Sequence, residues 1–295
     1  MPYINVDEAY ILDNTGLQVD QVVDIPYTDA ALTDGQKEQA RKNIAAGGTN
    51  PNLLDNPFFT VNQRGVAAGT FVNANGFVAD RWQATGTTGA TRNSDGSITV
   101  VDTMYHKLGD RGLDGKTVTL SALYTDGTIE SNTFTWVNSV SHNLPHLNAV
   151  VYASANQIKC NGGSLNVKAL KLELGTVSTL ANDIPPNYAE ELAKCQYYCR
   201  VITATANTHF ATGVSASAGN FRVPLPYAMR TTPSVTYSGT ISVAGASSIN
   251  ISAIAVAGAT NNSVTLSCTA TGITAGTAGL LLLANGATIT ISADL

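Results

Sequence analysis

The chain has 295 residues, enough for two domains of ordinary size or for one larger domain. Charged residues make up 13% of it, and 16 basic against 21 acidic side chains give a net charge of −5. Phosphate binding needs clustered Lys and Arg, so this composition disfavours a nucleic-acid partner. The longest apolar run, Leu280 to Ala284, is far shorter than the roughly 20 residues that span a bilayer, so we expect no membrane insertion.

Residues 1–50 are predicted to contain one clear helix and no core of their own. Thr33 and Gln36 form a capping box at the start of this helix, and Gly47-Gly48 ends it. A helix of about 14 residues is marginal in water by itself. Copies of the same helix around a threefold axis would stabilise it, which favours a homotrimer.

Residues 51–176 consist of short β-rich runs separated by turns. Two clear runs are Thr117–Tyr124 and Leu165–Leu174, and Asp95-Gly96 and Asp126-Gly127 are typical turn pairs. Several short strands at this spacing predict an antiparallel β-sandwich of the jelly-roll-like kind.

Residues 177–202 are predicted to form a connecting helix. Pro185-Pro186 stops the middle module, and Asn187 can cap a helix that runs from Tyr188 to about Val201. Apolar side chains along one side of this helix give it a face to bury.

The C-terminal part, residues 203–295, is predicted to form a second antiparallel β-sandwich, which makes the whole chain mainly β. Residues 264–268 alternate apolar side chains with Thr and Ser, the pattern of a half-buried strand. Residues 201–295 contain only three charged side chains, which are Arg222, Arg230 and Asp294. So few charges leave little to keep a monomer in solution, and we expect sister chains to cover the sides of this module.

A group of polar and aromatic residues in the middle module has the appearance of an active centre. Its members are Gln63, Arg64, Asp80, Arg81 and Trp82. We expect them to be structural, with Asp80 and an arginine bridging strand ends and Trp82 covering the core. An arginine satisfies the lone pairs of a buried carboxylate through two parallel hydrogen bonds.

Trp136 and Tyr124 are the best candidates for stacking against a sugar ring, because aromatic faces bind the apolar side of a pyranose. The alternative is that both are core aromatics. His142 is the polar candidate beside them. Its spacing to His146 would suit a metal on a helix, but Pro145 favours a loop, so we expect neither a metal site nor a cofactor.

No motif of nucleophilic or phosphate-transfer catalysis occurs in the sequence, so we expect no enzyme. One catalytic alternative stays open, a polysaccharide depolymerase, because glycosidases need only a pair of carboxylates. The acidic residues available for it are Asp102, Asp110, Asp114, Asp126 and Glu130.

Two motifs carry a resemblance to a known group of proteins. The stretch Asn52-Leu-Leu-Asp-Asn-Pro-Phe-Phe-Thr-Val-Asn-Gln-Arg-Gly65, followed by Ala79-Asp-Arg-Trp82, resembles the opening of a β-sandwich module in phage tail-fibre and receptor-binding proteins. Three further segments resemble the same group in the same order, and they are Ala31–Ala45, Leu170–Gly175 and Phe221–Pro233.

The resemblance implies a homotrimeric structural protein at the virion surface. Residues 1–50 would dock to phage virion proteins through Tyr10, Ile11 and Leu12. The middle module would be galactose-binding-like and would bind a host cell-surface saccharide, with the C-terminal module as the tip. Three weak sites on each fibre would give reversible multivalent adhesion. A head-fibre or capsid decoration protein is the structural alternative.

Overall fold

The computed structural model describes residues 50–294, except for residues 110, 138–139, 144–146, 153–155, 216–218, 226–227, 245–247, 261 and 273–277. The chain divides after Gly47 into two compact units, and every described residue lies in the second. The helix predicted at residues 33–46 and the docking residues Tyr10, Ile11 and Leu12 fall outside the described residues. The described part is mainly β, as predicted, and its sheets are antiparallel.

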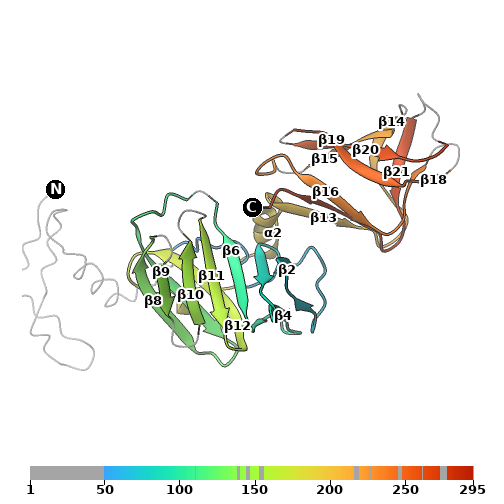
Figure 1. The fold of residues 1–295 in the computed structure, drawn as a ribbon. Coiled ribbons are helices and arrows are strands. Elements are labelled where there is room, and N and C mark those ends of the chain that lie inside the picture. The colour runs from blue at the N-terminus through green and yellow to red at the C-terminus, as the bar shows by residue number, and fades with distance from the viewer. Residues whose placement is uncertain are drawn as a thin grey trace, which may run out of the picture. The chain divides into compact units, whose positions relative to one another are not determined.

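Between residues 71 and 174, the described strands form two six-stranded sheets (Figure 1). The first has the order β1-β4-β5-β12-β7-β8, with bounds Phe71–Val72, Ala90–Arg92, Ile98–Val100, Leu165–Leu174, Thr117–Tyr124 and Ile129–Thr135. The second has the order β2-β3-β6-β11-β10-β9, with bounds Gly76–Ala79, Trp82–Thr85, Thr103–Lys107, Gln157–Gly162, Leu147–Tyr152 and Val140–Asn143. Strands β7 and β12 have the bounds that the sequence predicted, and they pair with each other.

Side chains from both six-stranded sheets fill one hydrophobic core. Trp82 of the second sheet and Leu120 and Leu170 of the first are among its most buried members. Phe59, from the loop before β1, meets Trp82 edge-on with ring centroids 5.3 Å apart. Each large apolar side chain that is fully buried contributes about 1.5–3 kcal/mol, so this shared core is the main source of stability for the module.

The outer face of β12 is buried as well, which alternation along the strand did not predict. Lys171 and Glu173 lie there with no exposed side-chain surface. Lys171 Nζ donates to Asp183 Oδ1 at 2.6 Å, and Glu173 accepts a hydrogen bond from the backbone N–H of Thr179 at 2.8 Å. The segment after β12, which includes the 3-10 helix η2 at Leu180–Asn182, is therefore tied back to the strand.

The described strands after residue 198 form a three-stranded and a seven-stranded sheet. The smaller has the order β13-β22-β16, with bounds Cys199–Thr203, Thr288–Ser292 and Ser234–Ser238. The larger has the order β18-β17-β21-β14-β15-β20-β19, with bounds Ser248–Asn250, Ile241–Ala244, Ala278–Leu283, Thr208–Ser215, Gly219–Pro224, Ser263–Thr269 and Ala253–Thr260. Phe221, Leu266 and Ile289 belong to a second core that both sheets share.

The connecting helix is shorter than predicted. Helix α2 covers Tyr188–Gln196, and the side chain of Asn187 caps it by accepting a hydrogen bond from the Ala189 N–H at 2.9 Å, as expected. The prediction of helix to about Val201 is wrong, because Cys199 already begins strand β13 and pairs with Ser292. Neither helix in the described part of the chain is long and apolar enough to cross a bilayer.

Candidate functional site

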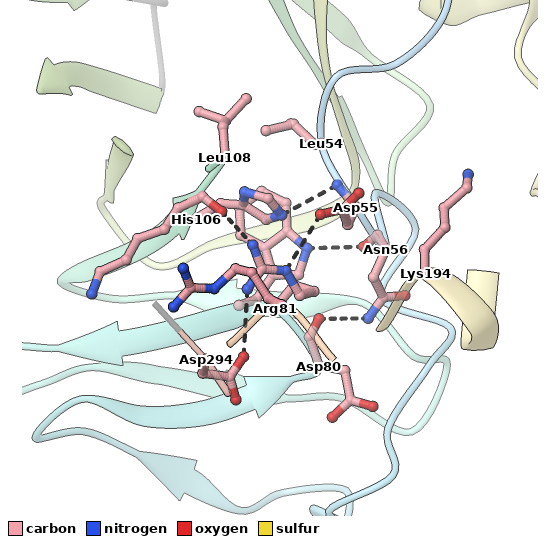
Figure 2. Close-up of polar contacts among 12 residues, drawn as sticks. Leu54, Asp55, Asn56, Asp80, Arg81, His106, Leu108, Lys194 and Asp294 are labelled. Carbon is pink, nitrogen blue, oxygen red and sulfur yellow. Dashed lines mark hydrogen bonds and ion pairs between the residues drawn. The ribbon is translucent and has the colours of Figure 1, made fainter. Parts of the chain in front are cut away.

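A cluster of charged side chains lies where the opening motif of the middle module meets α2 and the C-terminal end (Figure 2). We call this cluster the polar joint, and its charged members are Asp55, Arg64, Asp80, Arg81, Arg111, Glu191 and Asp294. Most of these groups are buried, so each charge must be balanced by a partner.

One asparagine of the opening motif, Asn56, makes hydrogen bonds that hold the backbone beside the joint. Asn56 has a φ of +53°, a left-handed conformation that Asn adopts more readily than most residues. Its Nδ2 donates to the carbonyl oxygens of Val61 and Asp80, both at 2.8 Å, and its Oδ1 accepts from the Val61 N–H at 2.9 Å. Its own carbonyl accepts from Trp82 Nε1 at 2.9 Å. The side chain of Asn56 thus holds the turn at Val61 and the residue Asp80 before β3, and its backbone carbonyl holds the indole of Trp82.

The residues predicted as a structural signature are brought together here. Asp80 Oδ1 pairs with Arg64 Nη1 at 3.0 Å, so the ion pair expected between Asp80 and an arginine is present. Asp80 Oδ2 accepts the Gln63 N–H at 3.0 Å. Two contacts reach further than predicted, since Arg64 Nη2 lies 2.6 Å from Asp294 Oδ2 and Gln63 Nε2 donates to the Cys199 carbonyl at 2.9 Å. The signature therefore binds the C-terminal strands as well as its own turn.

Arg81 occupies the centre of the joint, between Asp55 and Asp294 (Figure 2). Its guanidinium lies 3.4 Å from a carboxylate oxygen of each, and it also donates to the Lys107 carbonyl. The same guanidinium covers the ring of Tyr198 with its carbon 3.3 Å from the ring centroid, a cation–π contact. Its backbone is left-handed, with a φ of +72°, a conformation that such surrounding contacts must maintain.

The opening loop and α2 complete the charge balance. Arg111 Nη2 pairs with Asp55 Oδ1 at 3.2 Å. Glu191 of α2 accepts the Asn56 N–H at 2.5 Å and pairs with Lys194 at 3.1 Å. Burial raises the pKa of the Asp55 carboxyl above its ordinary value, more than the neighbouring Arg81 and Arg111 lower it. These contacts hold together three segments that are distant in sequence, which are the opening motif, α2 and the C-terminal end. We therefore assign the joint a structural role.

The residues predicted to stack on a sugar are not available for that contact. Trp136 is 0% exposed and Tyr124 is 6% exposed, both within the core of the two six-stranded sheets. The Tyr124 hydroxyl donates to Glu130 Oε2 at 3.0 Å. Of the two alternatives, sugar-stacking rings or core aromatics, their burial supports the second. His142 lies in β9 opposite Ala149, and its side chain is outside the described part.

The other candidate groups form no metal-binding cluster in the described residues. No group of three or more His, Cys, Asp or Glu side chains that could hold a metal ion occurs in that part of the chain. Asp102 Oδ2 accepts the Thr87 N–H at 3.1 Å, and Asp110 is outside the described residues. All four cysteines are buried free thiols, and burial raises the pKa of Cys268 to about 11 and that of Cys160 to about 12.

Several members of the joint were not predicted as part of it. They are His106, Arg111, Glu191, Tyr198 and, as a binding partner, Asp294. Asp294 gave one usable signal, because it is the only acidic residue among the last 95 positions of a nearly uncharged segment. Asp55 and Asn56 lie within the opening motif, but their contacts with Arg111 and Glu191 span many residues, so no local pattern indicates them.

Comparisons with protein-family models, with curated proteins and with solved structures each found no match to this chain. A functional argument must therefore start from the motifs of the sequence and the geometry of the polar joint.

Proposed function

We propose that this chain is a homotrimeric structural protein of a phage virion, a tail-fibre or receptor-binding component that adheres reversibly to a host-surface saccharide. In this proposal each pair of sheets forms a β-sandwich, the middle one jelly-roll-like and the C-terminal one the tip. Residues 1–50 dock to virion proteins, with Tyr10, Ile11 and Leu12 as contacts. The chain binds and does not catalyse.

The observation that carries this proposal is the use of the resemblance motifs as an internal joint. Gln63, Arg64, Asp80, Arg81 and Trp82 all make their principal contacts inside the chain. When the polar residues of a motif are used in contacts within the chain, a structural protein is favoured over an enzyme. The distinctive polar residues of an enzyme must face its substrate.

The surface of the C-terminal module supports assembly with sister chains. Of its three charged side chains, Asp294 pairs with Arg64, and Arg230 Nε donates to the Ala293 carbonyl at 3.1 Å. Arg222, which is exposed on β15, is the third, and Arg200 of β13, which donates to the Pro224 carbonyl at 3.0 Å, adds one more charge to these sheets. Leu280, on β21, is 37% exposed in the monomer. A protein with so few charges on its surface has low solubility unless other subunits cover part of that surface.

The saccharide site belongs on the surface and not on Trp136 or Tyr124. A net charge of −5 spread over the chain gives little attraction for a polyanion, so we propose a neutral glycan held by hydrogen bonds. Binding of this kind is weak at each site, and the trimer multiplies it through effective concentration.

The first test is the mass of the purified chain in solution. Sedimentation velocity at micromolar concentration should give about three times 30.7 kDa. A monomer would contradict the architecture. The trimer should then bind a glycan array with little dependence on salt, while a catalytic product, new reducing ends on host polysaccharide, would favour a depolymerase.

Docking is tested with a truncated chain that begins at Gly48, where the second compact unit starts. This chain should fold, should retain glycan binding and should fail to assemble onto particles. Normal incorporation would place the anchor elsewhere. Imaging of labelled full-length protein on particles separates a tail fibre from a head fibre or capsid decoration protein.

A further inference from the structure

The polar joint also contains a histidine, His106, whose presence is not explained by the balance of charges in the joint. His106 lies in β6 with 0% of its surface exposed, and its ring is 4.8 Å from that of Trp82. Its Nε2 accepts a hydrogen bond from the backbone N–H of Asp55 at 3.2 Å (Figure 2). Nε2 therefore carries no proton, the proton of the neutral imidazole is on Nδ1, and Nδ1 has no hydrogen-bond partner among the described residues.

Charged or titratable groups of both signs lie near His106 or near its neighbours Asp55 and Arg81. These groups are Asp55 from the opening loop, Arg81 from the turn before β3, Arg111 from the loop after β6, Glu191 and Cys195 from α2, Tyr198 before β13, and Asp294 at the C-terminal end. The carboxylates are already paired with Arg81, Arg111, Arg64 and Lys194. Among the described residues, no anion is thus left over to balance a positive charge on the imidazole.

Protonation of His106 would remove a contact and add a buried charge. A proton on Nε2 would point at the Asp55 N–H, so the one hydrogen bond of the ring would be lost. The new imidazolium would lie in a site already occupied by two guanidinium groups. Burial, and then Arg81, hold the pKa of His106 well below its ordinary value.

The sign of the resulting pH dependence follows from proton uptake. In the open or unfolded chain His106 titrates near its ordinary value of about 6.5, while in the closed joint it stays neutral. The open state therefore takes up the proton first, and the closed joint loses stability as the pH falls below about 6.5. Asp55 acts in the opposite direction, because its pKa is raised in the folded state and the folded chain therefore takes up that proton before the unfolded chain as the pH falls.

We propose that His106 makes the polar joint acid-labile, so that mild acid releases the opening loop and with it the hold of Arg81 and Arg64 on the C-terminal strands. Asp55 is the link in this chain of contacts, since its N–H binds His106 and its carboxylate binds Arg81. Arg81 in turn contacts Asp294 and Tyr198, which flank β22 and β13. The switch concerns the contacts between the middle and C-terminal regions and is independent of which surface the protein binds.

The experiment compares the full chain with His106→Gln and a matched control, His209→Gln. His209 is exposed on β14, so its change should leave the pH dependence as it is. Urea unfolding is measured at pH 7.5 and 5.5. Between these values the His106 effect should raise the unfolding equilibrium constant about tenfold in the wild type and in the control, and His106→Gln should lack this rise. An equal rise in all three proteins would overturn the proposal.

Two measurements on the wild type keep the test decisive if His106→Gln does not fold. Deuterium exchange at the imidazole carbon, followed by mass spectrometry, should show His106 remaining neutral at pH 5.5. An ordinary titration of His106 would reject the proposal. Amide exchange, corrected for its intrinsic pH dependence, should rise at Asp55 and in β13 before the rest of the chain on acidification. Exchange that rises everywhere together would show that acid unfolds the chain without opening the joint.

Discussion

The middle region, residues 50–175, and the C-terminal region, residues 199–294, both place antiparallel sheets around an apolar core, but different interactions define them. The middle region is fixed by individual polar contacts in irregular segments. Asn56 is hydrogen-bonded through its side-chain amide and through its backbone, and Lys171 is buried against Asp183 and Thr179. Such contacts cannot be exchanged for others without leaving a buried polar group unpaired.

The C-terminal region relies on alternation instead. In β22, Ile289 and Ile291 are buried while Thr288, Thr290 and Ser292 lie on the other side, and β20 repeats the pattern. Its hydroxyl groups bind backbone or one another at the surface, as Ser238 and Thr288 do at 2.7 Å. Stability in this region is therefore spread along the strand ladders, and no single polar side chain controls it.

The contrast teaches that the two regions specify their structures in different ways. The middle region carries the specific contacts that fix the chain geometry, including those that reach Asp294 and Cys199. The C-terminal region exposes neutral strands whose sequence is free to change as long as alternation is kept. A protein that must present a variable surface on a fixed base benefits from this division.

The largest expected difference between the two regions comes from removing the indole of Trp82, which is buried in the core of the middle region. Trp82→Ala should cost about 3–5 kcal/mol of unfolding free energy, the range for truncation of a buried large aromatic. It also leaves the carbonyl of Asn56 without its indole donor. Urea unfolding of the full chain measures the cost. Tyr237→Ala is the control from the C-terminal region, since Tyr237 is 36% exposed, and it should cost far less. Similar costs would show that the two regions are not differently specified.

A second test addresses the joint itself. Asp294→Asn removes the carboxylate that accepts from Arg64 at 2.6 Å and from Arg81 at 3.4 Å. We expect a loss of about 1.5–3 kcal/mol, the contribution of hydrogen bonds to charged groups, because both guanidinium groups stay buried without it. The matched control is Asp114→Asn at an exposed site. A double-mutant cycle with Arg64→Met should then show coupling, and additive effects would mean that the pair contributes nothing.

The sequence predicted the parts of the fold that depend on alternation. β7 and β12 have the predicted bounds because their apolar residues recur within one strand, where a short window of sequence contains the whole signal. The order of strands in the sheets was not predictable in this way. β12 lies between β5 and β7, and nothing within β12 specifies those neighbours.

The candidate site was predicted only as far as its local contacts. Asp80 and Arg64 are 16 residues apart, in two neighbouring motifs, and their pairing followed from these motifs. The contact from Arg64 to Asp294 spans 230 residues, and no local pattern carries it. The two alternatives for Trp136 stayed open for a related reason. Trp136 lies just beyond the end of β8, and only the three-dimensional packing shows that its ring is buried in the core.

The smallest expected effect tests the claim that the C-terminal region depends on its strand ladders. Gly213 of β14 and Gly258 of β19 lie in the same sheet. A Cβ on Gly213 would be 2.0 Å from the Asn220 carbonyl oxygen on the paired strand β15, whereas a Cβ on Gly258 would meet nothing within 4 Å.

Gly213→Ala should therefore cost about 1–2 kcal/mol, the lower part of the range for overpacking, because Gly213 is close to the end of the pairing between β14 and β15, where strands can shift. Gly258→Ala should be neutral or should stabilise by up to about 1 kcal/mol, since alanine restricts the unfolded chain. Thermal unfolding of both variants at one pH measures the difference. If the two variants behave alike, contact between the backbones of β14 and β15 does not limit this sheet, and its stability comes from the core side chains alone.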